Sequence, residues 1–167
     1  ILLPGCLLGA VMAPVSGRLL DAFGARRPIL TGACAVLLAC VLLWLTAPSC
    51  KTSMATCIYL LFAFGQGLMV GNTMTHALSG LADARKADGT AIINTLQQLA
   101  GALGTSIVTA VVATAQTSAG VSASEAGSAL SAATANGTQS ALALLVGVAA
   151  LVLVAEVLSL CAHRDRT

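Results

Sequence analysis

Residues 17–27 read GRLLDAFGARR, a short charged segment between two long uncharged runs. The runs on either side, 1–15 and 29–47, contain no Asp, Glu, Lys or Arg. The segment itself holds three arginines and one aspartate, namely Arg18, Arg26, Arg27 and Asp21. Charge that gathers where long apolar runs end is typical of a loop at a membrane surface. We therefore expect a membrane protein with this loop at one face of the bilayer.

The composition of the whole chain supports this interpretation. Hydrophobic residues make up 57% of the sequence and charged residues 8%, with a mean hydropathy of +0.94, far from the average soluble protein. A transmembrane helix needs about 20 mainly apolar residues, and such stretches occur at about 1–15, 29–47, 57–82, 90–115 and 140–162. They are too long, and too uniformly apolar, for the strands of a membrane barrel. The sequence predicts an all-α polytopic membrane bundle with five transmembrane helices.

The basic residues predict the orientation of this bundle. Segments rich in Lys and Arg face the cytoplasm, and the rich segments are loops 16–28 and 83–89 and the C-terminus, with Arg164 and Arg166. Loops 48–56 and 116–139 are then expected outside. We expect a multi-pass protein of the inner (plasma) membrane, surrounded by lipid, with a cytoplasmic C-terminus.

The outer loop 116–139 consists almost entirely of Ala, Ser, Thr and Gly. Ser122 with Glu125 fits an N-terminal capping box, and Asn136-Gly137 fits a helix stop. A short surface helix is therefore predicted between these two signals.

Patterns for catalysis or metal binding are missing from the sequence. The six cysteines show no C-x-x-C or Cys/His spacing, and there is no Ser/His/Asp set or Gly-rich phosphate-binding loop. Most cysteines are expected to be small apolar helix residues. A disulfide between Cys50 and Cys57 is one alternative, because both are expected at the outer face. The net charge of +2 is too small to indicate nucleic acid. We expect no enzyme activity, no cofactor, no metal and no nucleic-acid partner.

The charged segment also contains the residues needed to hold neighbouring helix ends together. Gly17 and Gly24 permit a tight turn, and Asp21 lies one helical turn from Arg18 and within reach of Arg26 or Arg27. We expect the carboxylate to be ionised and paired, so that the cluster holds helix ends together at one membrane face.

The full pattern Gly17-x-Leu19-x-Asp21-x-x-Gly24-x-Arg26-Arg27 resembles the signature loop of the major facilitator superfamily, which occurs once in each half of those transporters. Ala22 and Ala25 stand at two positions that are usually basic. The resemblance implies a gating loop made of Gly17, Arg18, Asp21, Gly24, Arg26 and Arg27.

A second stretch resembles one branch of this superfamily. Residues 89–105, GTAIINTLQQLAGALGT, are similar to the penultimate span of the fourteen-span drug:proton antiporters, with Ala100 where a glycine is usual. Residues 2–5, LLPG, with Pro14, are similar to the span before the signature loop of the second half. The resemblance implies the C-terminal half of such a transporter. The start at Ile1, and an odd number of spans that begins outside, agree with a missing N-terminal half of the same polypeptide.

Polar and small residues mark one face of that penultimate span. Helical spacing aligns Asn94, Gln98, Gly101 and Thr105, with Gln97 and Gly104 on the flanks. Such a stripe predicts either close packing against another helix or the wall of a wet, substrate-binding cavity. In the third span, Gly67 and Gly71 form a small-xxx-small pair, for which packing is the default interpretation.

Two ionisable residues lie within the predicted spans. His76 fits a neutral imidazole bonded to a neighbouring helix, or a proton relay. Glu156 fits a carboxylate that pairs with Arg164 or reaches the interface, or a proton-coupling group. Both are candidate proton-linked residues.

The resemblance implies a proton-driven multidrug efflux permease, in which two helical bundles rock around a midplane site and exchange protons for a small-molecule substrate. A transporter of a sugar, organic acid or siderophore is the alternative within the superfamily. A membrane scaffold or sensor that transports nothing is the alternative from another class.

Overall fold

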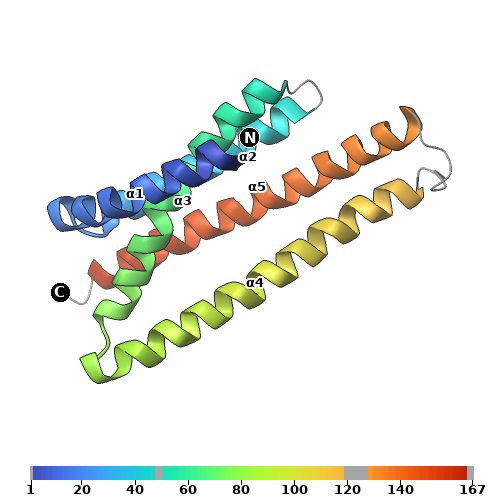
Figure 1. Ribbon diagram of the computed structural model, residues 1–167. Helices are drawn as coiled ribbons and strands as arrows, with labels where there is room; N and C mark the ends of the chain where they lie inside the picture. The colour runs from blue at the N-terminus through green and yellow to red at the C-terminus, as the bar shows by residue number, and fades with distance from the viewer. Residues whose placement is uncertain (1, 48–50, 119–127, 165–167) are drawn as a thin grey trace.

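The computed structural model describes residues 2–47, 51–118 and 128–164. These residues form α1 (Leu2–Phe23), α2 (Arg26–Thr46), α3 (Thr52–Ser79), α4 (Asp83–Ser118) and α5 (Ser128–Arg164), with no strand among them (Figure 1). All 5 helices are long and apolar enough to cross a membrane. The predicted all-α polytopic bundle is confirmed.

The segment expected as loop 16–28 is almost entirely helical. α1 continues to Phe23 and α2 begins at Arg26, so only Gly24 and Ala25 separate the two helices. Gly24 has a φ of 73°, the left-handed conformation that glycine adopts without strain. Its N–H donates to the Leu20 carbonyl oxygen at 2.9 Å and so closes the end of α1. A single glycine is enough to reverse the chain here, which is why no longer loop forms.

The predicted helix stop at Asn136-Gly137 is wrong, because α5 runs through both residues. Gly137 is a packing residue: a Cβ built on it would lie 2.9 Å from the Ala115 Cβ and 3.1 Å from the Val112 Cα of α4. The loss of a helix stop at this glycine reflects the close approach of α4 and α5 rather than local turn chemistry. Ser122 and Glu125, the predicted capping box, lie outside the described residues.

Close helix packing unites α1, α2 and α3. A Cβ built on Gly65 of α3 would lie 2.7 Å from the carbonyl oxygen of Gly32 on α2, so only glycines allow these backbones to meet. Gly67 faces Met12 of α1, whereas Gly71 has open space around it. Of the predicted pair Gly67 and Gly71, only Gly67 therefore lies at a helix contact.

α5 lies between the α1–α3 group and α4, and packs against α2 and α4 (Figure 1). α4 lies at the outside of the bundle, and none of its residues is buried. The α1–α2 link, the α3–α4 link and the end of α5 lie at one end of the bundle, and the start of α3 lies at the other. The described residues of the basic segments thus share one end of the bundle.

Candidate functional site

The predicted gating loop is divided between two helices. Gly17, Arg18 and Asp21 belong to the last turns of α1, Gly24 to the link, and the last pair to the first turn of α2, namely Arg26 and Arg27. All six are exposed, and a Cβ on Gly17 would have no atom within 4 Å. The loop therefore presents an open, charged surface at the end of the bundle.

The expected pairing of Asp21 with its own arginines is not formed. Asp21 makes no hydrogen bond or ion pair with any residue that the structure describes. The guanidinium of Arg27 instead lies over the ring of Phe23, 5.8 Å from its centre. The geometry of the tight turn, which places Phe23 next to the start of α2, explains this choice of partner. The Asp21 carboxylate is left available to a group beyond the described residues.

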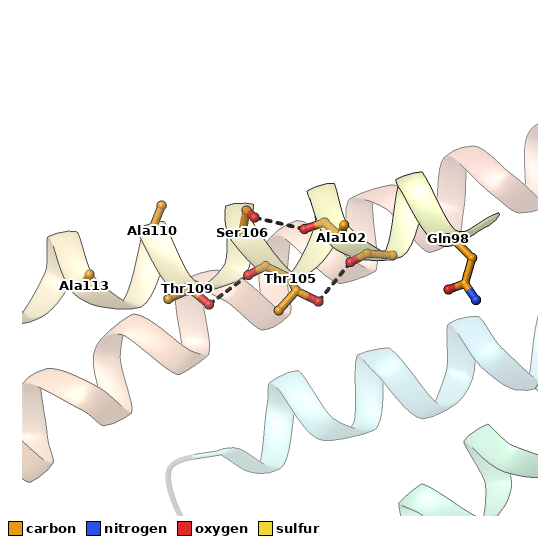
Figure 2. Close-up of a pocket in the computed structure, with 8 residues that line it drawn as sticks. Gln98, Ala102, Thr105, Ser106, Thr109, Ala110 and Ala113 are labelled. Atoms are coloured by element: carbon orange, nitrogen blue, oxygen red, sulfur yellow. Dashed lines mark hydrogen bonds between the residues drawn. The ribbon is translucent and has the colours of Figure 1, made fainter. Parts of the chain in front are cut away.

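An open groove of about 750 Å³ runs along α4 (Figure 2). Its lining residues are small or polar: Gln98, Gly101, Ala102, Thr105, Ser106, Thr109, Ala110 and Ala113. Three members of the predicted stripe, Gln98, Gly101 and Thr105, line it. The small face continues beyond the predicted stripe to Ala113, and its signal in the sequence is a small residue at every fourth position from Gly101.

The hydroxyls of this groove are satisfied by their own helix. Thr105 donates to the Gly101 carbonyl at 2.9 Å, and Thr109 donates to the Thr105 carbonyl at 2.8 Å (Figure 2). Ser106 does the same toward Ala102 at 2.9 Å. The groove is therefore mildly polar without a buried unsatisfied donor, a surface that fits either water or a close helix neighbour.

The remaining stripe residues point elsewhere. Gly104 borders a second recess, of about 460 Å³, between α4 and α5. Gln97 lines a third recess, between α3, α4 and α5. Asn94 is exposed on α4 and lines none of these three hollows. Gly101 and Thr105 border both the open groove and the second recess, so only Gln97 and Asn94 of the predicted stripe lie apart from these two adjoining hollows.

Glu156 faces the same recess as Gln97. Its Oε1 accepts a hydrogen bond from the Thr73 hydroxyl of α3 at 3.1 Å. The expected partner Arg164 has a side chain outside the described residues. The carboxylate is therefore turned toward a neighbouring helix within the bundle.

The two candidate proton-linked residues do not share a recess. His76 is half-buried on α3, its carbonyl accepts a hydrogen bond from Ser79 at 2.7 Å, and it does not line the recess around Glu156. At the other end of α3, Cys57 is exposed, and Cys50 lies outside the described residues. Neither His76 nor Cys57 adds a group to the hollows described above.

Comparison with known proteins decides the family. Residues 1–105 match the sequence profile of the Major Facilitator Superfamily. The chain belongs to this superfamily. The family predicted from residues 17–27 and 89–105 is thereby confirmed, and with it a multi-pass membrane protein. No solved structure matches the chain.

The chain is similar to several bacterial proteins. Identity is 36% over 118 residues with the lincomycin resistance protein LmrB of Listeria innocua, an alignment that covers 70% of this chain and 25% of LmrB. The LmrB of Bacillus subtilis is 33% identical over 123 residues, covering 70% and 24%. An uncharacterized MFS-type transporter of Bacillus subtilis, YhcA, is 31% identical over 117 residues, covering 70% and 22%. The matched part of the chain spans about a quarter of the length of these relatives.

Proposed function

We propose that this chain is the C-terminal part of a proton-driven multidrug exporter of the plasma membrane, which works by alternating access. Lincomycin is the first substrate to test, because relatives in the superfamily are named for resistance to it. In this proposal the polypeptide's N-terminal half supplies the second bundle, and the protein performs no covalent chemistry.

The observation that carries the proposal is the division of the exposed surface of α4. Ile92, Leu96, Leu99 and Leu103 repeat at helical spacing and form one large apolar face, which suits lipid. The groove lined by Gln98, Thr105 and Thr109 lies on a different face. A small, polar face this long has no reason to meet lipid, so it fits the second bundle and the wet path between the two bundles.

The charged loop fits the same mechanism. Asp21 is exposed and has no partner among the described residues, while the surrounding arginines keep this end of α1 strongly basic. A carboxylate in this state can take a cationic side chain or a helix N-terminus of the second bundle in one conformation and release it in the other. The loop would then bias the equilibrium between inward-open and outward-open states.

The orientation follows from the positions of the basic segments. The α1–α2 link, the α3–α4 link and the end of α5 lie at one end of the bundle, and the helix ends at these places carry most of the Lys and Arg residues. We assign this end, and with it the C-terminus, to the cytoplasm.

Accumulation of radiolabelled lincomycin in a sensitive bacterium tests the function. Cells that express the full-length protein should accumulate less lincomycin than cells with an empty vector, and a protonophore should remove the difference. Equal accumulation in both strains before the protonophore is added would contradict lincomycin export. A difference that survives the protonophore would contradict the proton-driven mechanism.

A further inference from the structure

The recess between α3, α4 and α5 surrounds the one acidic residue of the predicted spans. Its volume is about 280 Å³, and its polar groups come from Glu156 of α5, Thr73 of α3 and Gln97 of α4. The rest of its wall is apolar, with Met69, Met74 and Ile93 among the lining residues. Burying a charged carboxylate in such an apolar wall inside a membrane costs free energy, unless a proton or a counter-charge neutralises it.

The Thr73 hydroxyl behaves differently from its neighbours on the helices. Thr75 donates to the Gly71 carbonyl four residues before it, at 2.9 Å, and Thr105 on α4 does the same toward Gly101. Thr73 instead donates across to Glu156 at 3.1 Å. The hydroxyl therefore forms a specific link to the carboxylate rather than the default bond within its own helix.

This link spans a gap between two helices. No described Cα atom of α3 lies within 8 Å of one of α5, whereas α3 packs on α1 and α2. The hydrogen bond from Thr73 to Glu156 therefore joins two helices whose backbones are farther apart than those of packed neighbours such as α2 and α3.

Glu156 has no ion pair with any cationic side chain that the structure describes. No other ionisable side chain that the structure describes on the surrounding helices lines this recess: not Cys57, Tyr59 or His76 on α3, Arg26, Arg27, Cys34 or Cys40 on α2, Asp83, Arg85, Lys86 or Asp88 on α4, or Cys161 on α5. A proton is the cation that needs no further ligand and no further room to neutralise this carboxylate.

We propose that Glu156 is a proton-binding site of the C-terminal bundle, and that binding and release of the proton switch its hydrogen bond with Thr73. The ionised carboxylate accepts a charge-assisted bond from the Thr73 hydroxyl. When a proton adds to a carboxylate oxygen, the bond becomes one between neutral groups, and the link between α3 and α5 weakens. The inference rests on the proposed proton-driven transport and names a residue that couples the proton to helix movement.

Transport by the purified full-length protein in proteoliposomes tests this role. Lincomycin transport driven by an imposed pH gradient requires the coupled proton, whereas lincomycin counterflow at equal pH does not. Glu156→Gln should lower gradient-driven transport roughly tenfold or more and leave counterflow within about twofold. Glu156→Asp, which keeps the carboxylate, should restore part of the gradient-driven rate. Asp88→Asn, which removes an exposed carboxylate outside the recess, is the matched control and should change neither rate.

Threonine variants test the link itself. Thr73→Val removes the donor to Glu156 and should change the pH profile of gradient-driven transport relative to wild type, because the bond that the proton switches is lost. Thr75→Val removes only a bond within α3 and should leave the profile unchanged. Full gradient-driven transport by Glu156→Gln, or identical profiles for both threonine variants, would overturn the proposal.

A direct readout separates this inference from the proposed substrate. In pH-difference infrared spectra of the full-length protein, acidification should produce a carboxyl C=O band that Glu156→Gln lacks and Asp88→Asn retains. If the wild-type protein showed no gradient-driven lincomycin transport, the proposed function would fail, and this band would still decide the proton site. Identical difference spectra for wild type and Glu156→Gln would refute proton binding at Glu156.

Discussion

A methyl group at Gly65 tests the packing on which the bundle depends. In Gly65→Ala the new Cβ would lie 2.7 Å from the Gly32 carbonyl oxygen and 2.8 Å from the Val36 amide nitrogen of α2. Ordinary contacts begin near 3.4 Å, so α2 and α3 must separate by about 0.7 Å. A gap of that size forfeits roughly a quarter to a half of each dispersion contact that it affects. Because transmembrane helices associate largely through such contacts, the expected cost of overpacking is about 1–3 kcal/mol.

Gly71→Ala on the same helix is the control, because a Cβ there meets no atom within 4 Å. Alanine favours a helix over glycine by about 0.5–1 kcal/mol, so this variant should be as stable as wild type or slightly more stable. The assay is equilibrium unfolding of the purified full-length protein by sodium dodecyl sulfate. A Gly65→Ala protein as stable as Gly71→Ala would refute the close approach of α2 and α3.

Two further predictions concern the basic end of the bundle. Asp21→Asn in the full-length protein should lower lincomycin export roughly tenfold at matched membrane abundance, because it removes the charge that biases the conformational equilibrium; Arg85→Gln, a charge outside the loop, should have a much smaller effect, and equal export by the two variants would reduce the loop to a topology signal. Reporters fused after Lys86 and at the C-terminus should be cytoplasmic, and a tag inserted after Ser118 should be labelled from outside; external labelling next to Lys86 would reverse the proposed orientation.

The family and the helical architecture could be predicted from the sequence because their signals are local. Residues 17–27 combine charge, glycine spacing and uncharged flanks within one short segment. The length of the loop expected there was too great, because one left-handed glycine, Gly24, makes the turn and the residues on either side of the link are helical. At Gly137 the local sequence predicts a helix stop, but α5 continues through this residue and packs closely against Val112 and Ala115 of α4.

The parts of the site that could not be predicted depend on how the helices are rotated and placed. Thr73 and Glu156 are 83 residues apart, and nothing in the sequence joins them. Gln97 and Gln98 are adjacent, but a helix turns by about 100° between neighbours, so one faces the Glu156 recess and the other the open groove. Of the arginines expected to pair with Asp21, Arg27 lies over Phe23 instead.

The groove of α4 gives the most direct test of the proposed transport path, because water must reach this face at some stage of an alternating-access cycle. In a full-length protein whose native cysteines are replaced by serine, Thr105→Cys should react with a membrane-impermeant thiol reagent, and lincomycin should slow the reaction. Leu151→Cys, at a position of α5 that is 71% exposed on an apolar face, should stay unreactive from both sides of the membrane. If Thr105→Cys were as unreactive as Leu151→Cys with and without lincomycin, the groove would be a dry packing face and not part of a transport path.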